Sequence, residues 1–298
     1  MNQTQKLFQN EDGIYVSKKF DDSTNLVKSF YKHHPFPNYQ GKENKAKLIE
    51  LKNNNNFLKN IIDDIGYGKD VIEIGSGTSQ LSNLIAATSN NRVVAFDATY
   101  ESLMMGKKFS LDNQINNCSF VQGDISEINS IFPDEKFDYL ICSGVLHHTA
   151  DPYGNFNKIL KLLKNNGIVV LGLYNIYGRI YSKTIKYLYR LFGEKILSIF
   201  DPVYSQMKIS KEQKKSWVND QYHHPIESCH SFREVFQWFD ENQIQTINTI
   251  PPINEKYFDN KSLISMFNNI AVEIGINFSS LGKDGGLFVF SGKKCKKE

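Results

Sequence analysis

The feature that most constrains this chain is an alternation, between residues 70 and 173, of short β-rich runs with stretches in which apolar residues recur at helical spacing. The pattern predicts strands at 71–74, 93–96, 119–121, 137–142 and 168–173, with helices at 81–87, 103–111 and 156–163 among them. Strands joined by helices form right-handed crossovers, which place successive strands parallel in one sheet. The chain is therefore predicted to be an α/β protein whose ligands bind beyond the carboxyl ends of its strands.

Two other regions do not follow this alternation. Residues 1–65 show no sustained periodicity, so we expect an N-terminal extension that caps the domain and contains some helix. A basic, aromatic stretch of helical spacing at 179–200 predicts a helical insertion at 175–230. The elements predicted beyond it are a helix at 232–241 and strands at 244–250 and 287–290. We interpret residues 66–298 as one domain that carries this cap and this insertion.

The composition is that of a globular protein. Of the 298 residues, 40% are hydrophobic, and the longest apolar run, residues 167–174, is far shorter than the roughly 20 residues that cross a bilayer. Residues 1–20 are polar and charged and do not resemble a secretion signal, so we expect a cytoplasmic protein. The four cysteines are too far apart for a Cys-x-x-Cys unit, which predicts free thiols and no metal site.

A glycine turn follows the first predicted strand. Gly75 and Gly77 lack a Cβ and tolerate positive φ, which lets the backbone approach a ligand closely. A dinucleotide-binding fingerprint would need a third glycine at position 80, where the chain has Gln80, so a nicotinamide or flavin cofactor is not favoured. The turn is therefore a candidate binding site whose ligand must be identified from other residues.

Two carboxylates end the next two predicted strands. Asp97 lies twenty residues after Gly77, at the position from which an acid can accept both ribose hydroxyls of a nucleoside. Asp124 ends the third strand and could accept a hydrogen bond from an adenine amino group. Either acid could instead cap the helix that follows it. Together with the glycine turn, the two acids favour a ligand that contains a nucleoside.

The same region carries a series of short motifs. They are Val71-Ile72-Glu73-Ile74-Gly75-Ser76-Gly77-Thr78-Ser79, Asp97, Gly123-Asp124, Phe137-Asp138-Tyr139-Leu140 and Gly144-Val145-Leu146-His147-His148. In order and spacing this series resembles the class I S-adenosylmethionine-dependent methyltransferases. The resemblance implies a Rossmann-like, mostly parallel sheet of seven strands with the last strand antiparallel and helices on both faces. The N-terminal extension and the insertion after the fifth strand resemble those of a bacterial subgroup of this family.

The resemblance also implies the cofactor, S-adenosylmethionine, and a role for each motif that would bind it. Glu73 would help to hold the methionine amino end, Asp97 would hold the ribose, and Asp124 with Ile125 would frame the adenine. The candidate cofactor-binding residues are Glu73, Gly75, Ser76, Gly77, Asp97, Ala98, Asp124, Ile125 and Ser143. One departure is Ser79, which stands where the family often has a third glycine and which is expected to narrow the loop.

All seven histidines fall into three short segments, at 33–34, 147–148 and 223–230. His147 and His148 follow the fourth predicted strand, where the family places the acceptor against the methyl group, and an imidazole can serve there as a general base. The candidate catalytic residues are His147, His148, Tyr222 and His230. The candidate substrate-binding residues are Tyr31, His34, Tyr39, Tyr174, Asn175, Arg179 and His223. Each of these segments could instead serve as a structural cap or turn.

The acceptor is predicted to be a small molecule, with oxygen favoured as the acceptor atom. Residues 143–146 lack the Asn or Asp followed by Pro-Pro-Tyr of amino-methylating nucleic-acid enzymes, and no cysteine follows a proline, so DNA is not expected as a partner. Residues 179–215 hold nine Lys or Arg against three acids, and this basic insertion is expected to cover the acceptor site. Contact with RNA or with an anionic membrane is a less favoured alternative. An RNA or protein methyltransferase, and a non-catalytic donor-binding protein, are the alternative functions. The sequence carries no indication of an oligomeric state.

Overall fold

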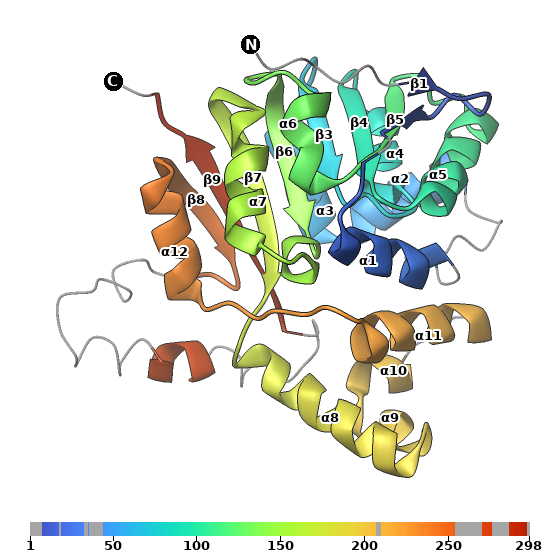
Figure 1. The fold of residues 1–298 in the computed structure, drawn as a ribbon, viewed down its shortest axis with the longest axis vertical. Helices are drawn as coiled ribbons and strands as arrows, with labels where there is room; N and C mark the ends of the chain where they lie inside the picture. Colours follow the sequence, from blue (N-terminus) through green and yellow to red (C-terminus); the bar gives the residue numbers. More distant parts are fainter. Residues whose placement is uncertain are drawn as a thin grey trace.

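The structure is a computed structural model that describes residues 8–17, 19–32, 35, 44–206, 210–253, 270–275 and 286–296. Within this part of the chain a twisted sheet lies between two layers of helices, and the N-terminal helix and the insertion lie beyond one end of the strands (Figure 1). The sheet has nine strands in the order β1-β2-β5-β4-β3-β6-β7-β9-β8. They are β1 (Phe8–Gln9), β2 (Tyr15–Val16), β3 (Asp70–Ile74), β4 (Arg92–Asp97), β5 (Cys118–Gln122), β6 (Phe137–Ser143), β7 (Leu163–Tyr174), β8 (Ile244–Ile250) and β9 (Leu287–Lys294).

The sheet has the predicted topology but not the predicted number of strands. The strands from β2 to β7 run parallel in the sheet, and β9 is antiparallel to both β7 and β8. A mostly parallel sheet with an antiparallel last strand is therefore confirmed, whereas the expectation of seven strands was wrong. The two further strands come from the N-terminal segment, where Tyr15 pairs with Val121 and Val16 with Gln122. A strand at the edge of a sheet leaves backbone N–H and C=O groups without partners in the sheet. Pairing with β2 gives the backbone groups at this edge of β5 their hydrogen-bond partners.

Alternate residues of the central strands point to opposite faces of the sheet. On β3, Ile72 and Ile74 pack on one face and Val71 packs on the other. The first face is covered by α6 (Ile128–Ile131), α7 (Pro152–Lys161) and α12 (Phe232–Glu241), and the second by α2 (Lys45–Asn54), α3 (Asn56–Ile65), α4 (Gln80–Thr88) and α5 (Tyr100–Asp112). Helices on both faces are thus confirmed, and burial on both faces explains the continuous apolar runs of these strands.

The insertion folds as a group of helices around a small core of its own. They are α8 (Gly178–Phe192), α9 (Lys195–Phe200), α10 (Pro202–Gln206) and α11 (Lys211–Val218), followed by a π-helical turn (Asn219–His223). Their buried core consists of Ile185, Leu197, Tyr204, Val218 and Tyr222. The stretch of helical spacing at 179–200 is divided into two helices, because Gly193, with φ +75°, ends α8 and turns the chain into α9.

The apolar residues of this region do not share one packed side. Ile185 and Leu197 are buried, whereas Ile180, Leu191 and Ile199 are 58, 57 and 70% exposed. The break after α8 changes the direction of the chain, so the spacing of one continuous helix does not apply across it. None of the described helices is both long and apolar enough to cross a lipid bilayer.

Candidate active site

A cavity of about 370 Å³ lies at the carboxyl ends of β3, β4 and β6. At this point the strand order reverses, because the chain builds β4 and β5 on one side of β3 and β6 and β7 on the other. The lining residues from the strand ends and the loops that follow include Glu73, Gly75, Ser76, Gly77, Asp97, Ala98, Ile125, Ser143 and His148. Helix α1 (Asp22–Lys32) contributes Thr24, Val27 and Tyr31, and the side nearest the insertion contributes Tyr174 and Gln221.

The loop after β3 is shaped for close approach of a ligand. Gly75 adopts φ +69°, and a Cβ there would lie 2.2 Å from Cγ2 of Val145. Gly77 adopts φ +52°. Ser79 adopts φ +59°, in the left-handed region that glycine prefers. A Cβ at Gly106 would lie 2.7 Å from Cβ of Ser79, so the glycine on α5 makes room for this serine.

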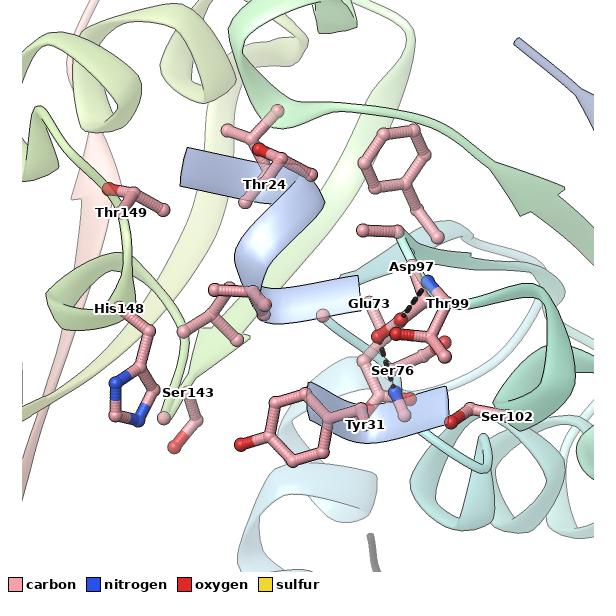
Figure 2. Close-up of a pocket in the computed structure, with 18 of the residues that line it drawn as sticks. Thr24, Tyr31, Glu73, Ser76, Asp97, Thr99, Ser102, Ser143, His148 and Thr149 are labelled. Atoms are coloured by element: carbon pink, nitrogen blue, oxygen red, sulfur yellow. Dashed lines mark hydrogen bonds between the residues drawn. The ribbon is translucent and has the colours of Figure 1, made fainter. Parts of the chain in front are cut away.

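Two desolvated carboxylates face the cavity beside this loop (Figure 2). Oδ2 of Asp97 accepts a hydrogen bond from the backbone N–H of Gly77 at 2.8 Å, and Oδ1 accepts one from that of Thr99 at 2.7 Å. Oε2 of Glu73 accepts a hydrogen bond from the backbone N–H of Ser82 at 2.8 Å. Burial raises the pKa of Glu73 to about 7 and also raises the pKa of Asp97. The two acids suit a ligand that brings positive charge or hydroxyl groups.

The other side of the cavity carries His148, which follows β6 (Figure 2). Its Nδ1 lies 2.6 Å from the carbonyl oxygen of Ile226. Because a carbonyl only accepts, Nδ1 carries the proton and Nε2 carries the lone pair. Burial lowers the pKa of His148 to about 4, so the ring is neutral at pH 7. Figure 2 shows Ser143 beside this ring and the hydroxyl of Tyr31 directed toward the same side.

Tyr174, the last residue of β7, contacts two side chains that do not line the cavity. The ring of His147 lies 4.0 Å from its ring, between centroids, at an interplanar angle of 32°. The guanidinium carbon of Arg179 also lies 4.0 Å from the Tyr174 ring centroid. The tyrosine hydroxyl accepts a hydrogen bond from Nε2 of Gln221 at 3.1 Å. Tyr174 and Gln221 line the cavity, whereas His147 and Arg179 do not.

Asp124, predicted to frame an adenine, does not line the cavity. Its buried Oδ1 accepts a hydrogen bond from the backbone N–H of Ser126 at 2.7 Å, and its Oδ2 accepts one from that of Asp21 at 2.8 Å. The carboxylate thus caps the helical turn Ile125–Glu127 and anchors the segment that leads into α1. Asp124 therefore has the alternative role of a helix cap. Its second oxygen, Oδ2, is occupied by the backbone N–H of Asp21 from the N-terminal segment.

Two of the candidate catalytic residues are buried away from the cavity. His147 is fully buried, neither of its ring nitrogens has a hydrogen-bond partner among the described residues, and burial holds its pKa well below the usual value. Tyr222 packs in the core of the insertion and donates its hydroxyl proton to Asp201 at 2.5 Å. The structure therefore gives these residues packing contacts, and leaves His148 as the candidate catalytic residue in the cavity lining.

His223 and His230, the two candidates from the late histidine segment, do not line the cavity. His230 contacts Oγ of Ser228 through Nε2 and a carboxylate oxygen of Glu234 through Nδ1, both at 2.9 Å. His223 is exposed, with its ring edge-on to Tyr189 at 5.5 Å. In the described part of the chain, no group of three or more His, Cys, Asp or Glu side chains is placed to hold a metal ion.

The remaining candidate substrate-binding residues divide between cavity and scaffold. Tyr31 and Tyr174 line the cavity. Oδ1 of Asn175 accepts hydrogen bonds from the backbone N–H groups of Tyr177 at 2.9 Å and Gly178 at 3.0 Å, so this buried side chain caps the start of α8. Two further candidates, His34 and Tyr39, lie outside the described residues.

Several cavity residues escaped the sequence-based prediction. Thr24, Val27 and Tyr31 have the i, i+3, i+7 spacing of one helix face, a signal that could have found the first two. Gln221 offered no such signal, because its direction depends on a π-helical turn in the insertion. His224, next to the predicted His223, carries the ring that contacts His148.

Comparison with known proteins identifies the family of this chain. The model of the family described as methyltransferase domain matches residues 65–248, which is more than half of the chain. The chain is 27% identical over 121 residues to the ubiquinone biosynthesis O-methyltransferase of Glaesserella parasuis serovar 5, covering 40% of this chain and 51% of that protein. It is 26% identical over 153 residues to the cycloartenol-C-24-methyltransferase of Arabidopsis thaliana, covering 50% of this chain and 44% of that protein. The chain thus spans about half the length of these curated relatives.

Two solved structures share the fold. The geranyl diphosphate C-methyltransferase of Streptomyces coelicolor A3(2) aligns with a TM-score of 0.54 at 11% identity, covering 93% of this chain and all of that one. PKMT2 of Rickettsia typhi aligns with a TM-score of 0.51 at 19% identity, covering 81% of this chain and 52% of that one. These likenesses concern the fold, and the family model covers the strands that build the cavity. The chain therefore belongs to the methyltransferase domain family.

Proposed function

We propose that this chain transfers a methyl group from S-adenosylmethionine to a hydroxyl oxygen of a small, uncharged molecule. The observation that carries the proposal is a single cavity with the carboxylates of Glu73 and Asp97 at the glycine loop and the neutral imidazole of His148 on the other side. The two carboxylates can bind the ammonium and hydroxyl groups of the donor. The imidazole can accept a proton from the acceptor.

The residues at the glycine loop fit the donor. The positive φ of Gly75 and the lack of room for a Cβ there provide a close backbone cradle. Asp97 would accept hydrogen bonds from the ribose hydroxyls, Glu73 would pair with the amino group, and Ile125 would contact the adenine. No lysine or arginine is among the described residues that line the cavity, which matches a donor without phosphates. When bound, the donor supplies a methyl group on a sulfonium, whose displacement needs alignment and no acid for the leaving group.

His148 would receive the proton of the acceptor at Nε2. The contact of Nδ1 with the carbonyl of Ile226 fixes the tautomer that leaves this nitrogen basic. A hydroxyl oxygen that gains a methyl group becomes strongly acidic, so an imidazole with a pKa of about 4 can still take its proton. The low pKa also keeps the ring neutral, and therefore able to accept, throughout the neutral pH range.

The uncharged lining supports an uncharged acceptor. Apart from Glu73 and Asp97, the described lining residues are neutral side chains, because burial also keeps His148 unprotonated. An ionised acceptor would lose its hydration against this wall without gaining an opposite charge. The names of the curated relatives mention transfer to oxygen in one case and to carbon in another. The lone pair of His148 favours oxygen, because a hydroxyl brings a proton that this nitrogen can accept.

Incubation with methyl-labelled donor and fractionated host metabolites, read by mass spectrometry, tests the proposal. We expect one fraction to give an O-methylated product. His148→Phe keeps a flat ring but no lone pair, and should lower kcat by about 10² while leaving the dissociation constant of S-adenosylhomocysteine unchanged. His223→Phe, at an exposed ring, is the matched control and should retain wild-type turnover. A label on nitrogen or carbon, or full turnover by the His148 variant, would contradict the proposal.

A further inference from the structure

A buried ion pair lies where the insertion leaves the sheet. Arg179, in the first turn of α8, is 1% exposed. Its Nη2 donates to Oε2 of Glu227 at 2.5 Å, and its Nε donates to Oε1 of the same carboxylate at 3.2 Å. Burying an arginine is costly unless a fork of hydrogen bonds compensates, and such a fork fixes the direction of the whole guanidinium. Glu227 therefore holds Arg179 in one orientation.

The rest of the guanidinium is directed at two residues of the cavity wall. Nη1 of Arg179 donates to Oε1 of Gln221 at 2.8 Å, and Nη2 also donates to the backbone oxygen of Gln221 at 3.1 Å. The guanidinium carbon lies 4.0 Å from the ring centroid of Tyr174, within the range of a cation–π contact. Gln221 and Tyr174 both line the cavity, so a buried charge acts on its wall from behind.

The contact with Arg179 decides which end of the Gln221 amide faces Tyr174. A glutamine amide can turn over and exchange its donor for its acceptor. An arginine only donates, so the amide oxygen must face Arg179, and Nε2 then donates to the hydroxyl of Tyr174 at 3.1 Å. The ring centroid of His147 also lies 4.0 Å from that of Tyr174. The ion pair between Arg179 and Glu227 thus fixes which end of the Gln221 amide meets the hydroxyl of Tyr174.

We propose that Arg179, held by Glu227, is a positioning residue for the acceptor end of the cavity. It sets the amide of Gln221 and the ring of Tyr174, and through them the affinity for the acceptor. The inference rests on the proposed function, since it concerns the acceptor of that reaction. The four residues come from β7, from α8, from the turn after α11 and from the loop beyond it. The insertion would therefore shape the acceptor end of the cavity.

The test compares Arg179→Met and Arg179→Lys with Arg190→Met, a matched control at an exposed arginine of the same helix. The first readout is the ring ζ-carbon signal of Tyr174 in protein labelled with ¹³C-tyrosine, identified by its absence in Tyr174→Phe. The second is label transfer to the active metabolite fraction, with kcat and KM measured separately. The third is the dissociation constant of S-adenosylhomocysteine. Gln221→Leu, which removes the amide without burying a lone charge, repeats the test if Arg179→Met does not fold.

We expect Arg179→Met to shift the Tyr174 signal and to raise the KM of the acceptor about ten-fold, the effect of one lost charge-assisted hydrogen bond, while kcat and donor affinity stay within about two-fold. The Tyr174 signal and the KM of Arg179→Lys should lie between those of wild type and Arg179→Met. Lysine keeps the positive charge but cannot form the two parallel hydrogen bonds of the guanidinium. A Tyr174 signal equal to that of wild type, or an equal loss of donor affinity, would overturn the inference. If wild type labels no fraction, the proposed function fails, and the Tyr174 signal alone then decides whether Arg179 positions this wall.

Discussion

His148 and His224 stack face to face, with ring centroids 3.5 Å apart and an interplanar angle of 28°. His148 follows β6, and His224 follows the last turn of the insertion, so the contact joins the sheet to the insertion. Phe30 of α1 meets His224 edge-on at 5.2 Å, which brings the N-terminal helix to the same cluster. Burial lowers the pKa of His148 to about 4 and that of His224 to about 3, so both rings are neutral when they stack.

This stack should make the fold sensitive to acid. The folded-state pKa of His224, about 3, lies below its ordinary value of 6.5, so between these values the unfolded chain binds more protons. Stability should therefore fall as pH drops through this window, by roughly 2 kcal/mol at pH 5 from His224 alone. Urea unfolding at pH 7.5 and 5.0 measures the effect. His224→Gln should reduce the pH dependence and the exposed His223→Gln should retain most of it; equal slopes for both variants would refute the prediction.

Asp97→Asn should weaken the binding of S-adenosylhomocysteine, the demethylated form of the donor. The variant loses the charge and half of the acceptor capacity beside Gly77, which should cost roughly 1–3 kcal/mol of binding free energy for S-adenosylhomocysteine. Isothermal titration calorimetry measures the change. Asp112→Asn, at an exposed acid on α5, is the control and should bind as wild type does. An unchanged dissociation constant for the Asp97 variant would remove this acid from the donor site.

Donor affinity should depend on pH through Glu73. Its pKa is raised to about 7 by burial, so the carboxylate is mostly protonated at pH 6 and mostly ionised at pH 8. A donor ammonium group pairs with the ionised form, so affinity should rise as pH increases through 7. Titrations with S-adenosylhomocysteine between pH 6 and 8 check this. Glu73→Gln should flatten the profile, and a flat profile in wild type would show that Glu73 does not meet the amino group.

Gly75→Ala should abolish donor binding by closing the loop against Val145. The new Cβ would lie 2.2 Å from Cγ2 of Val145, in addition to the strain of a positive φ. Gly66, with the same φ of +69° and nothing within 4 Å of the Cβ position, separates the two effects. Gly66→Ala should lose only about 1–2 kcal/mol of unfolding free energy. Gly75→Ala combined with Val145→Ala should recover part of the binding, and failure to recover any would exclude this clash as the cause.

Ser79→Gly should stabilise the protein. Ser79 holds a left-handed backbone, φ +59°, at a cost of about 1 kcal/mol that glycine does not incur. The variant loses the contact between the Ser79 and Ser76 hydroxyls at 3.2 Å, which offsets part of the gain. Thermal unfolding measures the difference. Ser89→Gly, at an extended residue with φ −146°, should destabilise the chain; stabilisation of similar size at both positions would point to a cause other than backbone strain.

Local patterns were sufficient for the central strands of the sheet and for the residues of the glycine loop and of β4 that line the cavity. Strands alternating with helices predict parallel pairing, and parallel pairing brings the strand ends that carry Gly75, Gly77 and Asp97 to one edge. Each of these residues is placed by its own strand and turn, so a short window of sequence contains the information. The two short N-terminal strands escaped prediction, because a pairing of Tyr15 with Val121 depends on an edge distant in the sequence.

The sequence by itself determined the fold class, the family and the strand ends that surround the cavity, because these follow from periodicity and from residues at fixed positions in strands. Only the tertiary structure decided how the side chains of the remaining candidate residues are directed. It turned His224 toward His148 and His223 toward solvent, gave Asp124 to the backbone of Asp21, and placed Arg179 behind the wall instead of in it. The direction of a side chain in a loop or a short turn is set by packing partners far away in the chain, and no local pattern encodes those partners.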